Sequence, residues 1–190
     1  PRFELPMPSW LSETWSMCSP AFASREQGDL ELEIPPALFP FGANFAVRTR
    51  VQIDFPFNVD LGRQAHGRLG EDEIDVLRRM VTAGHSGVWL PQAGLEHVIP
   101  SERATPDYVS SYFVGQGQAN VIKRQPTFQS RFHTFRAAVH HRICYWLKRN
   151  RAPAEEWVSH MIRSSIAWGE LSGGKRRPKA SSDSAAASSN

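Results

Sequence analysis

The first half of the chain has its clearest helical pattern in LGEDEIDVLRRMVTAG, residues Leu69 to Gly84. The apolar side chains recur there at three- and four-residue steps, which predicts an amphipathic helix from Glu71 to Ala83. Gly84 then ends the helix, as a glycine in this position commonly does. Three consecutive acids, Glu71 to Glu73, lie in the predicted first turn, where the positive end of the helix dipole favours ionised carboxylates.

Short strands are predicted on both sides of this helix. Phe45 to Arg50 alternates apolar and polar residues, as a half-buried strand does. Two further strands, Gly87 to Pro91 and Gly94 to Ile99, follow the helix and are separated by a turn. The proline-rich residues 1–40 are expected to be mostly irregular, apart from a short helix around Trp10 to Met17. The order strand, helix, strand, strand predicts an α/β fold with a mixed sheet.

The second half of the chain is predicted to be helical. A first helix opens at Thr105, which caps it, and runs to the flexible segment Gly115 to Gln118. Two longer amphipathic helices follow it. Their apolar residues recur at helical spacing: Phe132, Phe135, Val139, Ile143 and Trp146 in one, and Trp157, Met161 and Trp168 in the other. We therefore expect an α/β unit over residues 1–122, a basic helical extension over 123–171 and a disordered tail over 172–190.

The composition is that of a soluble globular domain and excludes a coiled coil, a collagen-like repeat and a wholly disordered chain. The 190 residues are 41% hydrophobic and 22% charged, with a formal net charge of +3. The charge is unevenly distributed, since residues 1–122 hold 9 Lys/Arg and 15 Asp/Glu, whereas residues 123–179 hold 13 Lys/Arg and three Glu. An acidic first part is thus followed by a basic second part.

The sequence also gives expectations about the cellular location of the protein and about the completeness of the chain. It contains no run of about 18 apolar residues, so no membrane-spanning helix is predicted. Cys18 and Cys144 are far apart, and a chain of this length needs no disulfide, so we expect free thiols in a reducing compartment such as the cytoplasm. The chain starts at Pro1 without a signal peptide, and we expect it to begin partway through a longer protein.

The acids at the start of the predicted helix have two interpretations. They can cap the helix on a solvated face, which is a common role of acids in a first turn. Alternatively, a Gly-rich loop precedes them and lets a substrate approach the backbone, so an ionised Asp72 can act as a general base. The residues alone leave both roles open.

The histidines carry a weaker signal. His97 lies in the second strand after the helix, and a lone histidine is more often a hydrogen-bonded core or edge residue than a metal ligand, because metal sites generally need several ligands. His140 and His141 cannot face the same way on a helix, so both are expected at the surface. No phosphate-binding glycine loop, zinc-type Cys/His spacing or Ser-His-Asp arrangement is evident.

Five segments occur in a characteristic order along the chain. They are FPFGANFAVR (Phe39 to Arg48), DLGR (Asp60 to Arg63), LGEDEIDVLRRMVTAG (Leu69 to Gly84), VWLPQAGLEHVIPSER (Val88 to Arg103) and YVSSYFVGQGQ (Tyr108 to Gln118). As an ordered set they resemble the C-terminal half of a family 2 glycosyltransferase, over most of the chain. The resemblance implies the GT-A nucleotide-diphospho-sugar transferase fold, and transfer of a sugar with inversion from a nucleotide-diphosphate donor to an acceptor hydroxyl.

The resemblance also implies roles for the residues of two segments. Asp72 matches the family's general base, which takes the proton of the attacking hydroxyl, and Glu71 would help to orient the acceptor or the loop. Gly42, Ala43 and Asn44 match the strand beside the donor sugar, where small residues let the sugar ring lie against the backbone. These five residues form the implied catalytic and sugar-binding set.

Three further residues follow from the resemblance. Arg103 and Gln116 lie in the segment that relatives use near the diphosphate and the acceptor. Arg103 would pair with a phosphate, although an exposed arginine beside a helix is the alternative. His97 matches a histidine that in some relatives completes the shell of a divalent cation, Mg²⁺ or Mn²⁺, on the diphosphate.

The nucleotide-binding half of the family is missing from this sequence. No βαβ pattern precedes Phe39, and Asp54 and Asp60 do not form the Asp-x-Asp pair that holds the metal in relatives. Most ligands of the cation are therefore expected from a missing N-terminal half. We expect the chain to be the acceptor-side part of a longer enzyme, inactive alone, that modifies a glycan or lipid-linked acceptor such as a cell-surface polysaccharide or a glycolipid.

A second class of function remains open. The basic residues 123–179 can form a non-catalytic module that binds an anionic membrane surface or nucleic acid. Their aromatic residues recur at helical spacing, which favours core or lipid-facing positions over base stacking, so no nucleic acid is expected as a partner. A peripheral position at the cytoplasmic face of a membrane is compatible with the glycosyltransferase as well.

Overall fold

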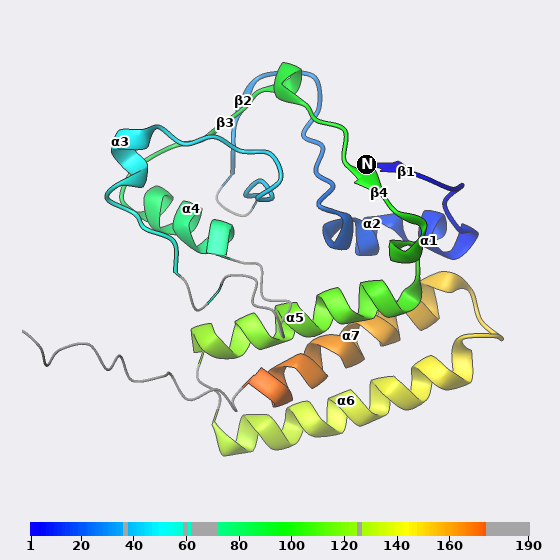
Figure 1. Cartoon of the computed structure of the whole chain (residues 1–190). Coiled ribbons are helices and arrows are strands. Elements are labelled where there is room, and N and C mark those ends of the chain that lie inside the picture. Colours follow the sequence, from blue (N-terminus) through cyan, green and yellow to red (C-terminus); the bar gives the residue numbers. More distant parts are fainter. Residues whose placement is uncertain (36–37, 59–60, 62–71, 125–126, 174–190) are drawn as a thin grey trace, which may run out of the picture.

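The computed structural model describes residues 1–35, 38–58, 61, 72–124 and 127–173 (Figure 1). These residues are mostly helical and form two layers. The lower layer contains the three long helices α5 (Pro106–Arg124), α6 (Phe128–Lys148) and α7 (Ala154–Gly173). The shorter elements lie above these helices, so the candidate residues of the first half belong to a different layer from the basic helices.

The upper layer is built from short elements. Its helices are α1 (Ser9–Glu13), α2 (Trp15–Cys18), α3 (Thr49–Gln52) and α4 (Asp72–Thr82), with 3₁₀ turns η1 (Ser19–Phe22), η2 (Pro91–Ala93) and η3 (Ser101–Arg103). Its strands are β1 (Arg2–Phe3), β2 (Leu32–Glu33), β3 (Val88–Trp89) and β4 (Val98–Ile99). The helix predicted around residues 10–17 is thus present as the two short helices α1 and α2.

The strands do not form the single mixed sheet that the sequence predicts. β1 pairs in parallel with β4, with Phe3 opposite Ile99, and β2 pairs antiparallel with β3, with Leu32 opposite Trp89. The two predicted strands after the helix are therefore present in shortened form, but each pairs with an N-terminal segment and not with its neighbour. Proline-rich residues that were expected to be irregular supply both partner strands.

The strand predicted for Phe45 to Arg50 is wrong. Residues 45–48 have no regular structure, and α3 begins at Thr49 with a turn in which the Val51 N–H donates to the Arg48 carbonyl. Alternation of apolar residues shows only that one side of a segment is covered. A strand also needs a neighbouring backbone for its hydrogen bonds, and none of the described strands pairs with this segment.

The helices predicted from periodicity are confirmed. α4, α6 and α7 cover the predicted segments, and the hydroxyl of Thr127 caps α6 by accepting from the Ser130 N–H. α7 continues to Gly173, so residues 172 and 173 belong to this helix, while the rest of the predicted tail, 174–190, lies outside the described residues. The boundary expected after residue 122 falls in the last turn of α5.

α7 is the middle helix of the lower layer, with α5 on one side and α6 on the other (Figure 1). The α5–α7 contact is made by glycines, since a Cβ atom on Gly169 would lie 2.1 Å from the Val114 carbonyl oxygen, and one on Gly117 would lie 2.1 Å from that of Ile166. The prediction of a flexible segment at 115–118 is therefore wrong. Gly117 lies inside α5 and Gly169 inside α7, and the absence of side chains there lets the two backbones approach each other.

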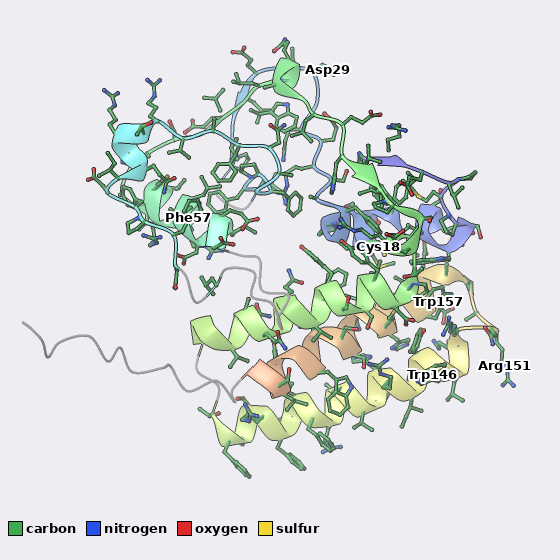
Figure 2. All side chains as sticks on the ribbon, viewed as in Figure 1. Cys18, Asp29, Phe57, Trp146, Arg151 and Trp157 are labelled. Carbon is green, nitrogen blue, oxygen red and sulfur yellow. The ribbon has the colours of Figure 1, made fainter. Side chains whose placement is uncertain are left out.

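The largest core joins the N-terminal helices to the end of the three-helix layer. Leu11, Phe22 and Val109 are fully buried in it, and the Trp10 and Trp157 rings pack with their centroids 5.5 Å apart. Cys18 lies in the same core, and Figure 2 shows it beside the start of α5. Among the described helices, none is long and apolar enough to cross a membrane.

Candidate functional site

Two segments that are 31 residues apart in sequence meet at the start of α4. The Gly42 N–H donates a hydrogen bond of 3.1 Å to Oε1 of Glu73. A Cβ atom on residue 42 would lie only 2.6 Å from that oxygen, so the contact requires a glycine or a displaced Glu73. Gly42 of FGAN (Phe41–Asn44) and the acids at the start of α4, Asp72 and Glu73, are separate in the sequence but form one corner of the surface.

A second hydrogen bond fixes the other end of the FGAN segment. Nδ2 of Asn44 donates to the Ala93 carbonyl oxygen at 2.8 Å, which joins the segment to the turn η2. Gly42, Ala43 and Asn44 are all exposed. The segment is therefore held at both ends while its backbone faces solvent, an arrangement in which a ligand can approach the main chain closely.

The acids of this corner share a hydrogen bond. Burial raises the pKa of the Glu73 carboxyl, and the hydrogen bond and charge of Asp72 raise this pKa further, while the N–H groups of Glu73 itself and of Gly42 act in the opposite direction. Asp72 occupies the first position of α4, near the positive end of the helix dipole, which stabilises negative charge.

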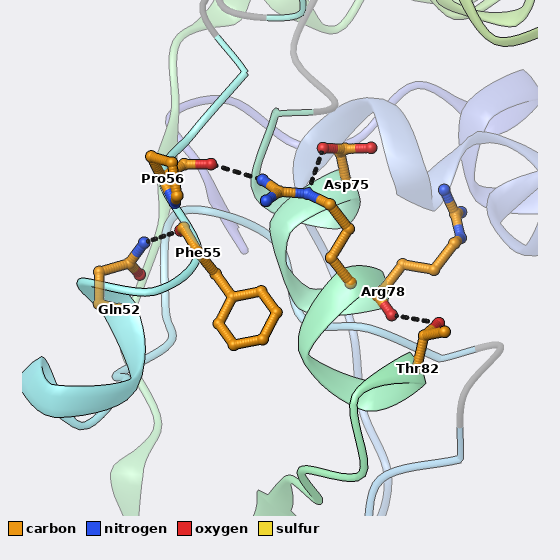
Figure 3. A network of polar contacts seen from close by, with 7 residues as sticks. Gln52, Phe55, Pro56, Asp75, Arg78 and Thr82 are labelled. Atoms are coloured by element: carbon orange, nitrogen blue, oxygen red, sulfur yellow. Dashed lines mark hydrogen bonds and ion pairs between the residues drawn. The ribbon is translucent and has the colours of Figure 1, made fainter.

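Side-chain contacts also join α4 to the segment that follows α3. Arg79 pairs with Asp75 one turn earlier, with Nε and Oδ2 3.1 Å apart, and its guanidinium also donates to the Pro56 carbonyl oxygen (Figure 3). In the same view Gln52 donates to the Phe55 carbonyl at 2.7 Å. These contacts fix α4 against the segment that follows α3, and so fix the direction in which its first turn points.

A cavity of about 540 Å³ lies between α4, β3 and the segment that contains FGAN. Its lining is largely apolar and includes Phe39, Asn44, Phe45, Leu77, Met80 and Trp89. Asn44 therefore lies between the carboxylate corner and an apolar hollow. The lining is suited to apolar groups of a partner segment more than to a sugar, which needs several hydrogen-bonding side chains.

The remaining predicted site residues lie on other elements. Nδ1 of His97 lies 3.0 Å from the Phe22 carbonyl oxygen, to which it donates. The Arg103 guanidinium lies over the Tyr108 ring, 5.7 Å from its centroid. Gln116 is half-buried in the middle of α5, and Glu71 lies outside the described residues. The contacts above thus join Gly42 to the start of α4 and Asn44 to η2, whereas those of His97 and Arg103 lie near η1 and α5.

Arg25 is a further candidate that the sequence does not indicate. Its guanidinium lies over the Phe41 ring, 4.9 Å from the centroid, next to the FGAN segment. Its Nη1 atom is buried without a hydrogen-bond partner, and burial lowers the pKa of the guanidinium. A buried unpaired donor is costly unless a ligand satisfies it, and a guanidinium suits phosphate oxygens.

His140 is exposed, as expected, whereas His141 is half-buried between α6 and α7. Nδ1 of His141 lies 2.9 Å from Nδ1 of His160 on α7, whereas His140 contacts Cys144. Burial lowers the pKa of His141 and of His160, and the nearby positive charges lower both further. The sequence alone does not show that α7 returns along this part of α6.

The described residues do not by themselves fit a divalent cation. They include no group of three or more His, Cys, Asp or Glu side chains arranged to hold a metal ion. His97 remains a single candidate ligand, and a bound Mg²⁺ or Mn²⁺ needs several oxygen ligands.

Comparisons of the chain with protein-family models, with curated proteins and with solved structures find no match. The functional argument therefore depends on the residues and their geometry.

Proposed function

We propose that this chain is the acceptor-side, catalytic-base part of an inverting glycosyltransferase that moves a sugar from a nucleotide-diphosphate donor to an acceptor hydroxyl. The observation that carries the proposal is the hydrogen bond between Gly42 and Glu73, which brings together the FGAN segment and the acids of α4. The resemblance to family 2 glycosyltransferases assigns these two segments to one site. Their contact here supports that assignment.

The proposed chemistry uses Asp72 as the general base. Its carboxylate takes the proton of the acceptor hydroxyl while the hydroxyl oxygen bonds to the anomeric carbon of the donor sugar. The bond from that carbon to the diphosphate oxygen breaks, and its electron pair leaves with the nucleoside diphosphate. Attack from the face opposite the leaving group inverts the anomeric configuration.

Neighbouring residues would prepare the base and the sugar. The hydrogen bond between Glu73 and Asp72 would orient the Asp72 carboxylate for the reaction. The exposed backbone of Gly42 and Ala43 gives the donor sugar a surface without side-chain obstruction, while Asn44 fixes the loop. Glu71 would orient the acceptor.

Charged groups of the donor would be held by other residues. Arg25 is the better-supported phosphate ligand, because it has an unsatisfied buried nitrogen beside the FGAN segment. Arg103 and Gln116 would act near the diphosphate and acceptor. His97 would supply one ligand to Mg²⁺ or Mn²⁺ through Nε2, since Nδ1 donates to a backbone carbonyl; the other ligands would come from outside this chain.

We further propose that the upper layer is the C-terminal part of a larger α/β domain of the GT-A type. Several large apolar side chains of this layer are exposed: Leu30, Leu38, Ile53, Phe57, Val88, Leu90 and Leu95. Together with the apolar cavity, they give a surface that a nucleotide-binding half would cover. The strands are short for the same reason, since a two-stranded ribbon is only marginally stable without further strands.

We place the reaction in the cytoplasm, at the inner face of a membrane that carries the glycan or lipid-linked acceptor. Cys18 and Cys144 are both free, as expected of thiols in a reducing compartment.

The test of the base is Asp72→Asn in the full-length protein, assayed for release of nucleoside diphosphate from a panel of UDP- and GDP-sugars. We expect kcat to fall by about 10²–10⁴-fold, with donor affinity unchanged, because only the proton transfer is lost. Asp54→Asn is the matched control, since Asp54 is exposed and lies outside α4. Wild-type turnover by Asp72→Asn, or turnover by the 190-residue chain alone, contradicts the proposal.

A further inference from the structure

α6 has one covered side and one uncovered side. It packs against α7, where Ala138 and Tyr145 are buried and the Ala138 carbonyl accepts from the Ser164 hydroxyl. On the other side its side chains extend away from α7 into solvent (Figure 2). The structure therefore leaves the outer side of a 21-residue helix available for a partner.

The outer side carries a row of exposed apolar residues, which we call the α6 stripe; Phe135, at the edge of the row, also packs edge-on against the Trp168 ring of α7. Its members are Phe128, Phe132, Phe135, Ile143, Trp146 and Leu147, with exposed fractions from 48% for Phe135 to 89% for Phe128. Successive helical residues are turned by about 100°, so these six lie within about 120° of the circumference and span about 28 Å. An exposed apolar surface of this length marks an interaction site.

The charge around the α6 stripe is of one sign. Residues 127–153 contain six basic residues and no Asp or Glu. By helical geometry Arg136 lies near one edge of the stripe and Arg142 just beyond the other. Arg149 covers the Trp146 ring at 5.7 Å from its centroid, and Figure 2 shows Trp146 and Arg151 at the same end of the lower layer. The nearby Glu156 is already paired with Lys148.

An anionic lipid surface fits this pattern best. Aromatic and aliphatic side chains gain free energy on entering the boundary between headgroups and acyl chains, and flanking arginines bind the lipid phosphates. Nucleic acid would satisfy the arginines but offers no apolar region for Ile143 and Leu147. A protein groove would accept the apolar residues but gives no reason for the complete absence of acids.

We propose that α6 lies in the plane of an anionic membrane surface, with the α6 stripe inserted among the lipids and Arg136 and Arg142 at the phosphates. The inference deepens the proposed location at the inner membrane face and rests on the proposed function for the choice of that face. It does not depend on the chemistry of Asp72.

The test is flotation of the 190-residue chain with vesicles of phosphatidylcholine alone, and of phosphatidylcholine with about a third phosphatidylglycerol, without donor or acceptor. We expect binding to the anionic vesicles that weakens as ionic strength rises, and little binding to the neutral ones. No binding to the anionic vesicles, tighter binding to a single-stranded oligonucleotide, or dimerisation through the α6 stripe overturns the proposal.

Two pairs of variants locate the surface. Phe132→Ser/Trp146→Ser and Arg136→Glu/Arg142→Glu should each weaken binding at least about tenfold. The matched controls are Leu30→Ser/Ile53→Ser and Arg48→Glu/Arg50→Glu, which change exposed residues of the upper layer and should bind as wild type. Circular dichroism confirms that each variant is folded, and equal losses in variants and controls contradict the assignment to α6.

The chemistry and the location fail separately. Asp72→Asn should bind anionic vesicles as wild type, because Asp72 lies on α4 in the upper layer. If the chain binds anionic vesicles but Asp72→Asn keeps wild-type turnover, the membrane proposal is supported and the glycosyltransferase proposal is contradicted. If the chain does not bind vesicles but Asp72→Asn loses turnover, the membrane proposal is contradicted and the glycosyltransferase proposal is supported.

Discussion

The two layers of this protein expose apolar residues in different ways. In the lower layer α5, α6 and α7 cover one another closely, and the exposed apolar residues of α6 form a single stripe in one direction. In the upper layer the exposed apolar residues are spread over several short elements, and the elements are held by individual contacts such as Gly42 to Glu73 and Asn44 to Ala93. The lower layer thus gathers its exposed apolar residues on one helix, whereas the upper layer distributes them.

The largest loss of stability is expected where the backbones of α5 and α7 lie closest to each other. Gly169→Val should destabilise the chain by about 3 kcal/mol or more, because even its Cβ atom would lie 2.1 Å from the Val114 carbonyl oxygen and α5 would have to move. Thermal or urea unfolding measures this. Ala137→Val, on the exposed side of α6, is the control and should cost only the helix propensity of valine, about 0.6 kcal/mol. Equal costs for the two variants contradict close packing of α5 and α7.

The next prediction tests whether the layers unfold separately. Val76 is fully buried in α4, and Val76→Ala should cost about 2 kcal/mol locally. Because α4 lies in the upper layer, hydrogen exchange should speed up there and stay unchanged in α7. Val88→Ala, at a half-exposed position, should change stability by less than about 0.5 kcal/mol. Faster exchange in both layers would show that they unfold as one unit.

A smaller effect is expected when the pH is lowered, because two histidines of the lower layer then bind protons. The pKa of His141 and that of His160 lie below the ordinary value of 6.5, so the unfolded chain binds protons first as pH falls. The contribution of these two neutral histidines to the free energy of unfolding is therefore complete above pH 6.5 and is lost as pH falls toward their pKa values in the folded chain. His140, Lys148 and Arg163 disfavour protonation, and Glu156 favours it at His160.

The measurement is the unfolding temperature between pH 7 and pH 5, in the wild type and in His160→Gln. The wild type should lose more stability, by less than about 1 kcal/mol because both rings are partly solvated. His133→Gln, on the exposed side of α6, is the control and should follow the wild type. A His160→Gln variant with the same pH slope as the wild type contradicts the contribution of this pair.

The smallest change in stability, yet the sharpest test of the upper layer, is Gly42→Ala. The added methyl group displaces the Glu73 carboxylate, which is the flexible end of a side chain, so the cost should stay below about 1 kcal/mol. Loss of the hydrogen bond from the N–H of residue 42 should raise the pKa of Glu73 further, which carboxyl NMR titration measures. Gly94→Ala, where a Cβ atom would meet only an ordinary contact at 3.8 Å, should leave that titration unchanged.

Sequence reasoning succeeded where the pattern is local. The apolar periods of α4, α6 and α7 were predictive because each helix buries one side. The prediction failed where a distant segment decides the outcome. Gly117 lies within a helix with Gly169 against it, and β3 pairs with residues near Leu32, neither of which a local pattern indicates.

In the candidate site, too, some features follow from local sequence patterns and others only from long-range contacts. Asp72 and Gly42 are visible in the sequence as motifs, and Glu73 was in the same acidic run, but only the fold connects Glu73 to Gly42. Arg25 has no local signal, because its importance comes from burial beside Phe41 and an unsatisfied nitrogen. Sequence patterns identify reactive groups, whereas burial and partners depend on long-range contacts.

The central position of α7 has a consequence for synthesis. α7 is the last of the three helices to leave the ribosome, yet it is the one against which both α5 and α6 pack. Until it emerges, the sides of α5 and α6 that face α7 have no partner, so the lower layer closes in one late step. During translation a chaperone or a lipid surface would meet these two helices first, before their fold is complete.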